Sequence, residues 1–319
     1  MKLVIFIPCL NEEETLPSVL KSIPAKISGV DTIEVLIVDD GSTDNTVTVA
    51  KRLGVRHFLR HTVRQGLSKS FRDGLNYALE MGADIIVLTD GDNQYPQECT
   101  PDLIQPILEG RADTVIADRQ VQTITHFSPN KKILQWFGTW VLNTAAGTKI
   151  PDAVSGFRAY SRAAALQLNP VAPYSFATET TIQAAHKGQS IAIVPIKTNP
   201  KTRESRQFKS NWQHVRRSSV TIVRAFYMYR PFALFLPLGF FFLVVGAAPF
   251  VHFFWLTITT KSPFGAHHLQ SLIIGSVLLV ASFISFTLGV IADLIRINRL
   301  LLEDILERQK RLDYDSERR

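Results

Sequence analysis

The chain has 319 residues, of which 46% are hydrophobic and 20% are charged, so it can build a packed core and global disorder is excluded. Its length accommodates one large soluble domain and a smaller second unit. The formal net charge is +7, and it is concentrated, because residues 197–230 hold nine Lys or Arg and one acid. A basic patch just before an apolar run suggests contact with anionic lipid or phosphate. The alternative, nucleic-acid binding, has no motif in its favour.

The beginning of the chain resembles a signal peptide only superficially. The apolar run Leu3 to Ile7 is short, acidic residues follow from Glu12 onward, and no small-residue cleavage site is present. We therefore predict a first β-strand here. The two cysteines, Cys9 and Cys99, are too few for a disulfide framework and form no CxxC pair. We interpret both as buried thiols of a protein from a reducing compartment.

The first 200 residues alternate between strand and helix patterns, which predicts a doubly wound α/β sheet of the Rossmann-like type. Short runs rich in Val and Ile, each ending in polar or acidic residues, are typical of buried parallel strands. These runs are Leu3–Ile7, Glu34–Val38 and Asp84–Leu88. Ser42 or Thr43 is expected to cap a helix that ends near Leu53. Gly66 is expected to open another helix, with Phe71, Leu75 and Leu79 on one face.

Acidic residues follow two of these strands, where ligands bind in such sheets. Asp39 and Asp40 end the second run, and Asp90 and Asp92 come after the third. Two carboxylates two residues apart, with the amide oxygen of Gln94 beside them, are ligands for a hard cation such as Mg²⁺ or Mn²⁺. Asp-x-Asp alone is weak, since turns also produce it. An EF-hand is disfavoured because its terminal glutamate is missing. The Asp39–Asp40 pair can accept hydrogen bonds from a base or a ribose, although a capping turn also uses such residues.

Two later segments are long enough to cross a membrane. Neither Phe232–Ile258 nor Leu269–Ala292 contains Lys, Arg, Asp or Glu, and each exceeds the about 20 residues that a bilayer requires. A buried core helix is the alternative. Basic residues on both flanks, at 224, 230, 296 and 299, against one in the link of residues 259–268, place the flanks in the cytoplasm by the positive-inside rule. We therefore expect an integral membrane protein with two spans, its catalytic domain and both termini being cytoplasmic.

Amphipathic patterns lie on either side of the two spans. Asn211–Tyr229 resembles a basic interface helix, and a connector packed on the soluble domain is an equal alternative. From Asp293 onward the chain predicts a charged helix with a stripe at three-four spacing. The stripe consists of Ile291, Ile295, Asn298, Leu302, Ile305, Gln309 and Leu312. It suits a seam between copies of the chain, hence a homo-oligomer, or an amphipathic cytoplasmic helix.

The ordered motifs resemble one family. These are Ile7-Pro8-Cys9-Leu10-Asn11-Glu12-Glu13, Val38-Asp39-Asp40-Gly41-Ser42-Thr43-Asp44, Arg64-Gln65-Gly66-Leu67, Asp90-Gly91-Asp92-Asn93-Gln94-Tyr95-Pro96, Ser155-Gly156-Phe157-Arg158 and Arg203-Glu204-Ser205-Arg206. Together they resemble the family-2 glycosyltransferases of the GT-A fold, in particular dolichyl-phosphate mannose synthases and bacterial enzymes that glycosylate polyprenyl phosphate. The paired spans match the bacterial subgroup. The resemblance covers nearly the whole chain and implies four regions: a catalytic domain (1–208), a juxtamembrane helix (209–230), two transmembrane helices (231–292) and a C-terminal helix (293–319).

The resemblance also implies roles by position. The nucleotide-sugar would be bound by Pro8, Leu10, Glu12, Asp39, Asp40, Asp90 and Gly91. The metal and the diphosphate would be held by Asp90, Asp92 and Gln94. The acceptor phosphate would be bound by Arg119, Lys131, Lys132, Ser205 and Arg206, with Arg203 in the same closing loop. Around residues 119 and 203–206 the sequence departs from the usual family pattern, so the acceptor side is the weaker inference.

An inverting hexose transfer from a UDP- or GDP-linked sugar to a polyprenyl phosphate follows from this resemblance. A lipid phosphate is already anionic and requires positioning more than deprotonation. Asp92, Arg119 and Arg203 would act at the catalytic centre, and Glu179 lies where processive relatives place a base; a buried or capping acid is its alternative. Two rival functions stay open: a transferase with a hydroxyl acceptor, and a non-catalytic protein that binds nucleotide sugars. A transporter is disfavoured because neither span holds a charge.

Overall fold

The computed structural model describes residues 1–120, 138–140, 142–144, 146–171, 176–200, 231–260 and 269–316. The chain divides into two compact units, Met1–Ile222 with Glu303–Arg319, and Val223–Leu302. The expected juxtamembrane helix and link, together with Lys131, Lys132, Arg203, Ser205 and Arg206, lie outside the described residues.

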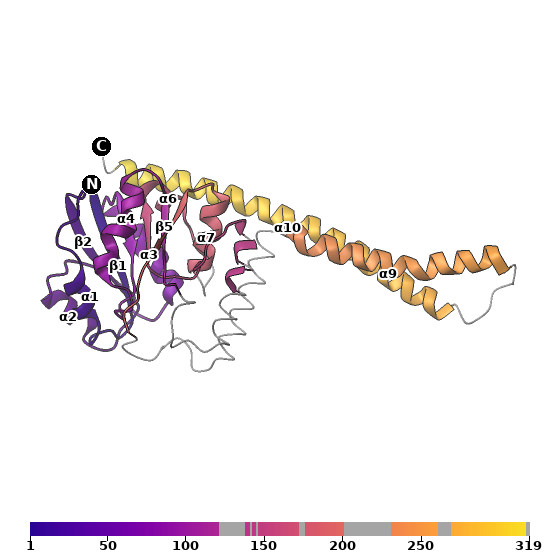
Figure 1. Ribbon diagram of the computed structural model, residues 1–319, viewed down its shortest axis with the longest axis horizontal. Helices are drawn as coiled ribbons and strands as arrows, with labels where there is room; N and C mark the ends of the chain where they lie inside the picture. Colours follow the sequence, from indigo (N-terminus) through magenta and orange to yellow (C-terminus); the bar gives the residue numbers. More distant parts are fainter. Residues whose placement is uncertain are drawn as a thin grey trace. The chain divides into compact units, whose positions relative to one another are not determined.

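A sheet forms the centre of the first unit (Figure 1). It is mixed and has seven strands in the order β3-β2-β1-β4-β6-β5-β7. Its strands are β1 (Lys2–Cys9), β2 (Thr32–Asp39), β3 (His57–Arg60), β4 (Ile85–Leu88), β5 (Thr114–Asp118), β6 (Arg158–Ser161) and β7 (Ile191–Pro195). The three predicted strands are therefore confirmed, and the first two extend beyond their predicted ends. All pairings are parallel except those of β6, which runs antiparallel to β4 and β5. The predicted doubly wound sheet is thus mixed.

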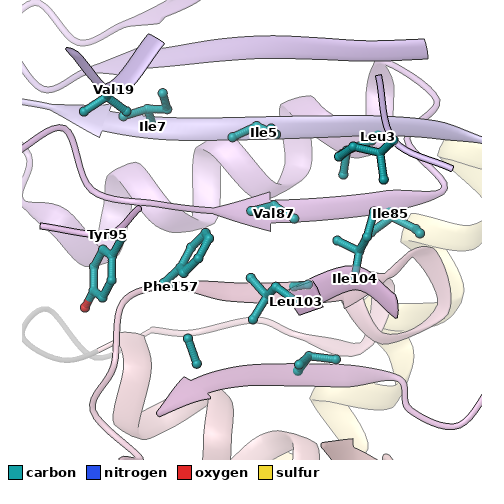
Figure 2. Close-up of a cluster of buried hydrophobic side chains, with 14 of the residues drawn as sticks. Leu3, Ile5, Ile7, Val19, Ile85, Val87, Tyr95, Leu103, Ile104 and Phe157 are labelled. Atoms are coloured by element: carbon teal, nitrogen blue, oxygen red, sulfur yellow. The ribbon is translucent and has the colours of Figure 1, made fainter. Parts of the chain in front are cut away.

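Helices cover both faces of this sheet. They are α1 (Leu16–Ser22), α2 (Thr46–Arg52), α3 (Leu67–Glu80), the short 3₁₀ helix η1 (Gln97–Cys99), α4 (Thr100–Leu108), α6 (Arg162–Gln167) and α7 (Phe176–His186). Alternate residues of β1 face opposite sides, as strand geometry requires. Leu3, Ile5 and Ile7 pack with α1, α2 and α4 (Figure 2), whereas Val4 and Phe6 pack with α3, α6 and α7. Central strands buried on both faces explain the uninterrupted apolar runs in the sequence.

Two local predictions have different outcomes. The helix after Gly66 is confirmed as α3, whose Phe71, Leu75 and Leu79 are all buried. The expected cap at Ser42 or Thr43 is wrong, because α2 begins only at Thr46. The Ser42 hydroxyl instead accepts a hydrogen bond from the backbone of the loop that follows β1.

The second unit is built from α9 (Pro231–Thr260) and the first part of α10 (Leu269–Ser316); the residues of α10 from Glu303 onward belong to the first unit. Both are long and apolar enough to cross a membrane, and large side chains such as Phe254 and Phe283 are exposed along them. A core helix would bury these side chains, so that alternative loses its support. The predicted C-terminal helix is no separate element: α10 continues past Ala292 because residues 290–316 contain neither Pro nor Gly.

Small residues bring α9 and α10 into direct contact within this unit. A Cβ atom added at Gly246 would lie 3.0 Å from the Gly275 carbonyl oxygen, and one added at Gly275 would lie 2.8 Å from that of Gly246. The Ser282 hydroxyl donates to the Gly239 carbonyl at 2.7 Å. Close backbone approach and interhelical hydrogen bonds of this kind hold helices together in lipid, where no hydrophobic force drives them together.

Candidate active site

The carboxyl ends of the neighbouring parallel strands β1, β2 and β4 lie at the point where the strand order changes direction, since β2 and β3 follow on one side of β1 and β4 lies on the other. β1 pairs with β2 on one side and β4 on the other, and Cys9 lies opposite Asp39. Parallel α/β sheets bind ligands at such a switch point. Burial, followed by the charges of Glu12, Asp39 and other nearby acids, raises the pKa of the Cys9 thiol. The edge therefore gathers the acidic residues that the sequence placed at separate strand ends.

Asp39 is fully buried at the end of β2. Its Oδ1 atom accepts a hydrogen bond from the Ser42 backbone N–H at 2.9 Å. Arg60 Nε lies 3.0 Å from Oδ2, but Oδ2 makes no hydrogen bond within the described part of the chain, so this contact is one of charge alone. A buried carboxylate oxygen without a hydrogen bond is costly. A ligand that donates an N–H or O–H group would satisfy it.

Asp40 has a different surrounding from its neighbour. Its two oxygens accept hydrogen bonds from the backbone N–H groups of Gln65 (2.7 Å) and Gly66 (2.9 Å). His61 Nδ1 lies 2.9 Å from Asp40 Oδ1, and its Nε2 lies 3.2 Å from Asp73 Oδ2. Asp40 therefore fastens the loop at the end of β3. The geometry gives its predicted contact with the nucleotide no support.

His61 is a residue that sequence reasoning missed. It is a single histidine after a strand, which carries no local signal, and its two carboxylate partners lie 21 and 12 residues away. Both ring nitrogens face carboxylates, and the Lys69 ammonium lies 2.6 Å from Asp73 Oδ2. This chain of polar and charged groups ties α3 to the carboxyl end of β2.

The loop after β1 is held against the loop after β4. Thr15 Oγ1 lies within hydrogen-bonding distance of both Glu12 Oε2 (2.8 Å) and the Gly91 carbonyl (2.7 Å). A Cβ atom at Gly91 would lie 3.1 Å from Glu12 Cγ, so the two segments touch. Of the other residues predicted to bind nucleotide, Pro8 is buried within β1 and Leu10 is half-buried just after it.

The Asp90–Gln94 loop follows β4 and is closely braced. Asp92 Oδ1 accepts a hydrogen bond from the Gln94 backbone N–H at 3.1 Å. A Cβ atom at Gly156 would lie 3.0 Å from Asp90 Oδ2, and the Gly156 N–H donates to the Tyr95 hydroxyl at 2.9 Å. The Asp90 carboxylate is therefore confined by the segment that precedes β6.

The donor set of this loop suits a hard cation. Asp90 and Asp92 are partly accessible beside the carboxyl edge of the sheet, and carboxylates with an amide oxygen are oxygen ligands of the type that Mg²⁺ and Mn²⁺ take. No group of three or more His, Cys, Asp or Glu with metal-binding geometry occurs among the described residues. A cation held here would thus complete its coordination with water or substrate phosphate, as Mg²⁺ usually does.

Arg119 forms a bidentate pair with the buried Asp152. Its Nε and Nη2 atoms donate to Asp152 at 2.6 and 2.9 Å. Burial opposes the charge, but Tyr95, Asp152 and Asp90 together raise the pKa of Arg119, so the guanidinium stays charged. The pairing explains why Arg119 stands in a defined orientation near Asp90. Asp152 was not predicted, because 33 residues separate the partners.

Arg158 is a second arginine whose contacts the sequence did not show. It is fully buried, and its guanidinium donates to three backbone carbonyls and two threonine hydroxyls, those of Ala153, Ser155, Ala177, Thr180 and Thr181. The side chain thus joins the segment before β6, which confines Asp90, to the first turns of α7. Glu179 on α7 is also buried, and its Oε2 accepts a hydrogen bond from the Val171 N–H at 2.9 Å. That contact is the one expected if Glu179 is a buried acid with a structural role, the alternative to a catalytic base.

The sheet order and the acidic switch point define an α/β domain of the GT-A type. Glucosyl-3-phosphoglycerate synthase from Mycobacterium tuberculosis, solved with UDP, superposes with a TM-score of 0.56 at 23% identity, over 70% of this chain and 79% of that one. Glycosyl transferase family 2 matches residues 4–168, just over half of the chain. The chain therefore belongs to glycosyl transferase family 2 and is a glycosyltransferase.

Three relatives place the chain within this family more narrowly. Undecaprenyl-phosphate mannosyltransferase of Micrococcus luteus is 30% identical over 206 residues, 61% of this chain and 83% of that protein. Polyprenol monophosphomannose synthase of Mycolicibacterium smegmatis is 28% identical over 60% of this chain and 76% of its own length. UDP-N-acetylglucosamine–dolichyl-phosphate N-acetylglucosaminyltransferase of Methanococcus voltae is 27% identical over 61% and 84%.

Proposed function

We propose that this protein transfers a hexose from a UDP- or GDP-linked sugar to a polyprenyl phosphate at the cytoplasmic face of a membrane, with inversion at the anomeric carbon. The observation that carries the proposal is Asp39 Oδ2, a buried acceptor to which no described residue donates a hydrogen bond, at the switch point shared with Asp90. The names of the relatives support a lipid phosphate acceptor. Their sugars differ, and the transfer assay described below identifies the hexose.

The donor would bind along the carboxyl edge of β1 and β2. Asp39 Oδ2 would accept a hydrogen bond from the base or the ribose, in addition to its ion pair with Arg60. Pro8, Leu10 and Glu12 would line the same pocket, and the Asp40–His61 contacts would hold its outer loop in place. Recognition by an acceptor carboxylate selects a ligand with N–H or O–H donors, as nucleosides have.

The diphosphate would lie beside Asp90, Gly91 and Asp92. A divalent cation held by Asp90, Asp92 and Gln94 would offset the charge that develops on the departing nucleoside diphosphate. Structural neighbours of this chain have been crystallised with Mn²⁺ or Mg²⁺, which supports the choice of metal. The chain's own contribution is to confine the Asp90 carboxylate through Gly156 and Tyr95.

The acceptor phosphate would be positioned by arginine. Asp152 occupies Arg119 Nε and Nη2, and we propose that the Nη1 donors bind a phosphate oxygen. We propose the same role for Lys131, Lys132, Arg203, Ser205 and Arg206, which lie outside the described residues. A phosphate oxygen held in line with the departing diphosphate requires no general base, so attack is governed by orientation.

The two apolar helices would anchor the enzyme in the bilayer that holds its acceptor. α9 and α10 are each long enough to cross. By the positive-inside rule, the basic flanks favour a cytoplasmic position for the first unit, which holds the candidate active site and is called the catalytic unit below. A soluble lipid-phosphate transferase would have to extract its substrate, whereas an anchored one meets the headgroup at the membrane surface. Protease digestion of sealed vesicles would test this orientation. Protease should remove the catalytic unit from inverted vesicles, whose cytoplasmic face is outside, and should leave it intact in right-side-out vesicles.

A two-phase transfer assay tests the reaction. Purified protein in detergent receives polyprenyl phosphate, Mg²⁺ or Mn²⁺, and separately labelled UDP- and GDP-sugars, and label in the organic phase is counted. We expect label from one donor only, lost with EDTA and in the Asp92→Asn variant. Nucleotide affinity is measured in parallel by calorimetry. Nucleotide binding without label in the organic phase from any donor would overturn the lipid acceptor.

Glu179→Gln separates this function from transfer to a hydroxyl acceptor. A hydroxyl nucleophile requires a base, so the variant should then lose activity by about 10²-fold or more. With a phosphate acceptor we expect less than a tenfold loss, because Glu179 would serve mainly to hold the Val171 backbone. Thermal stability is measured beside activity, so that a folding defect is recognised.

A further inference from the structure

The end of α10 uses its charged face to pack on the catalytic unit. Glu303 and Lys310 are only 8% and 6% exposed. Lys310 Nζ donates to the Leu168 carbonyl at 3.1 Å. Lys187 of the catalytic unit forms ion pairs with Asp304 and Glu307. In Figure 1 the yellow end of α10 runs along this unit. Polar residues therefore occupy the inner face of the helix, which is the reverse of an ordinary amphipathic helix.

The outer face of the same helix is apolar and exposed. We name it the α10 stripe, which consists of Ile291, Ile295, Asn298, Leu302, Ile305, Gln309 and Leu312. Its five apolar members are between 48% and 74% exposed. The intervals alternate between four and three residues, so the stripe keeps one line along the helix for three heptads. Among the described residues, the contacts of the helix end with the catalytic unit are made by the opposite face, through Lys310, Asp304 and Glu307.

The distal half of the stripe lies beyond the apolar segment and belongs to the first unit. Residues 290–316 contain neither Pro nor Gly, and α10 is continuous through them. A straight helix rises about 1.5 Å per residue, so Leu312 lies about 30 Å along the axis from Ala292, where the apolar span ends. Ile305 and Leu312 therefore lie outside the segment that length and composition assign to the membrane.

The stripe is self-complementary in the way that a parallel pair of helices requires. When Ile295, Leu302 and Gln309 are taken as heptad a positions, Asn298, Ile305 and Leu312 fall at d positions. Asn298 and Gln309 then meet their own copies, and a polar residue at such positions selects register. Arg308 and Asp313 flank the stripe at g and e positions and are exposed. Asp313 lies five positions after Arg308, and this spacing places Arg308 of one helix beside Asp313 of the other in a parallel pair.

We propose that the α10 stripe pairs with the α10 stripe of a second copy of this chain, as a parallel, in-register coiled coil at the membrane surface. Two copies anchored in one bilayer with the same orientation present their α10 helices in parallel. From the proposed function, the pairing uses only the membrane anchor, which gives the two copies the same orientation. Its consequence is that each catalytic unit is fastened by the inner face of α10 while the outer face joins two such units.

Disulfide trapping in native membranes tests the pairing without any sugar transfer. Gln309→Cys, in a chain with Cys99→Ser, places a thiol at an a position, where parallel in-register helices bring the two copies within disulfide reach. Arg311→Cys is the matched control two residues away, off the stripe. We expect a covalent dimer from Gln309→Cys and little from Arg311→Cys. Equal, low yields from both would overturn the pairing.

The mass in detergent provides a second readout. Light scattering after gel filtration should give an oligomer for the native chain and a monomer for the Ile305→Lys, Leu312→Lys variant. An exposed lysine on a helix whose inner face is unchanged should leave the melting temperature of the catalytic unit within about 2 °C. A monomeric native chain would refute the proposal whatever the transfer assay shows, and a lack of transfer in a stable dimer would refute only the proposed function.

Discussion

Gly156 offers a sharp test of how the site is built, because it has no Cβ where one would press on Asp90. A methyl group there would lie 3.0 Å from Asp90 Oδ2 and 3.4 Å from Asp90 Cγ, so one of them must move by a few tenths of an ångström. The backbone cannot retreat freely, since the Gly156 N–H donates to the Tyr95 hydroxyl at 2.9 Å. The Tyr95 ring in turn stacks on Phe157, with centroids 5.4 Å apart.

We expect Gly156→Ala to lower transfer activity at least about tenfold, which corresponds to about 1.4 kcal/mol in the barrier. Misplacement by a fraction of an ångström at a reacting centre has effects of this order. Overpacking costs about 1 to 3 kcal/mol of stability, so the melting temperature should fall by only a few degrees. Activity should respond far more than fold.

The assay is initial-rate transfer into the organic phase, repeated over a titration of Mg²⁺ and of Mn²⁺. The variant should require more metal for half-maximal rate, because Asp90 is displaced. Val154→Ala is the matched control: it lies two residues away, is 39% exposed, and should behave like the native chain. Native rate and native metal dependence in Gly156→Ala would refute the reasoning that Asp90 is confined for catalysis.

Three further predictions follow from other contacts. His61→Leu should lower the free energy of unfolding by about 1.5–3 kcal/mol and weaken nucleotide binding, as measured by thermal melting and calorimetry. His57→Leu, which removes the half-exposed pair with Glu34, is the control and should change nucleotide binding little. Unchanged nucleotide binding in both variants would contradict the role of His61 in holding the loop. Burial, then Arg72, lowers the pKa of Lys310 from 10.5 to about 8, so between those pH values the unfolded chain binds the extra proton and stability rises with pH. Lys310→Met should therefore be more stable than the native chain near pH 7, by at most about 3 kcal/mol. The difference in free energy of unfolding between the two should shrink towards pH 10. A difference that stays constant with pH would refute this prediction. Gly246→Leu should force α9 from Gly275 and lower the melting temperature of the detergent-solubilised hairpin, and an unchanged value would show that the helices do not pack there.

The linear order of residues determined the elements and the acidic edge. Apolar runs ending in Asp39 and before Asp90 identified buried strands and put carboxylates at their ends, because strand burial and turn chemistry are local properties. The same is true of the two long helices, which are recognisable by length and composition alone. Motif order then allowed the family to be predicted from the sequence, and the comparisons confirmed it.

Partner choice was decided by the tertiary structure. Arg119 and Asp152 lie 33 residues apart, and Lys310 and the Leu168 carbonyl lie 142 apart, so no local pattern links them. The reversed direction of β6 and the engagement of Asp40 by its neighbouring loop are of the same kind. The stripe on α10 was visible in the sequence, but which face of that helix packs on the catalytic unit was not. Periodicity reports that a face is apolar, whereas its partner is set by whichever surface the folded chain brings within contact distance.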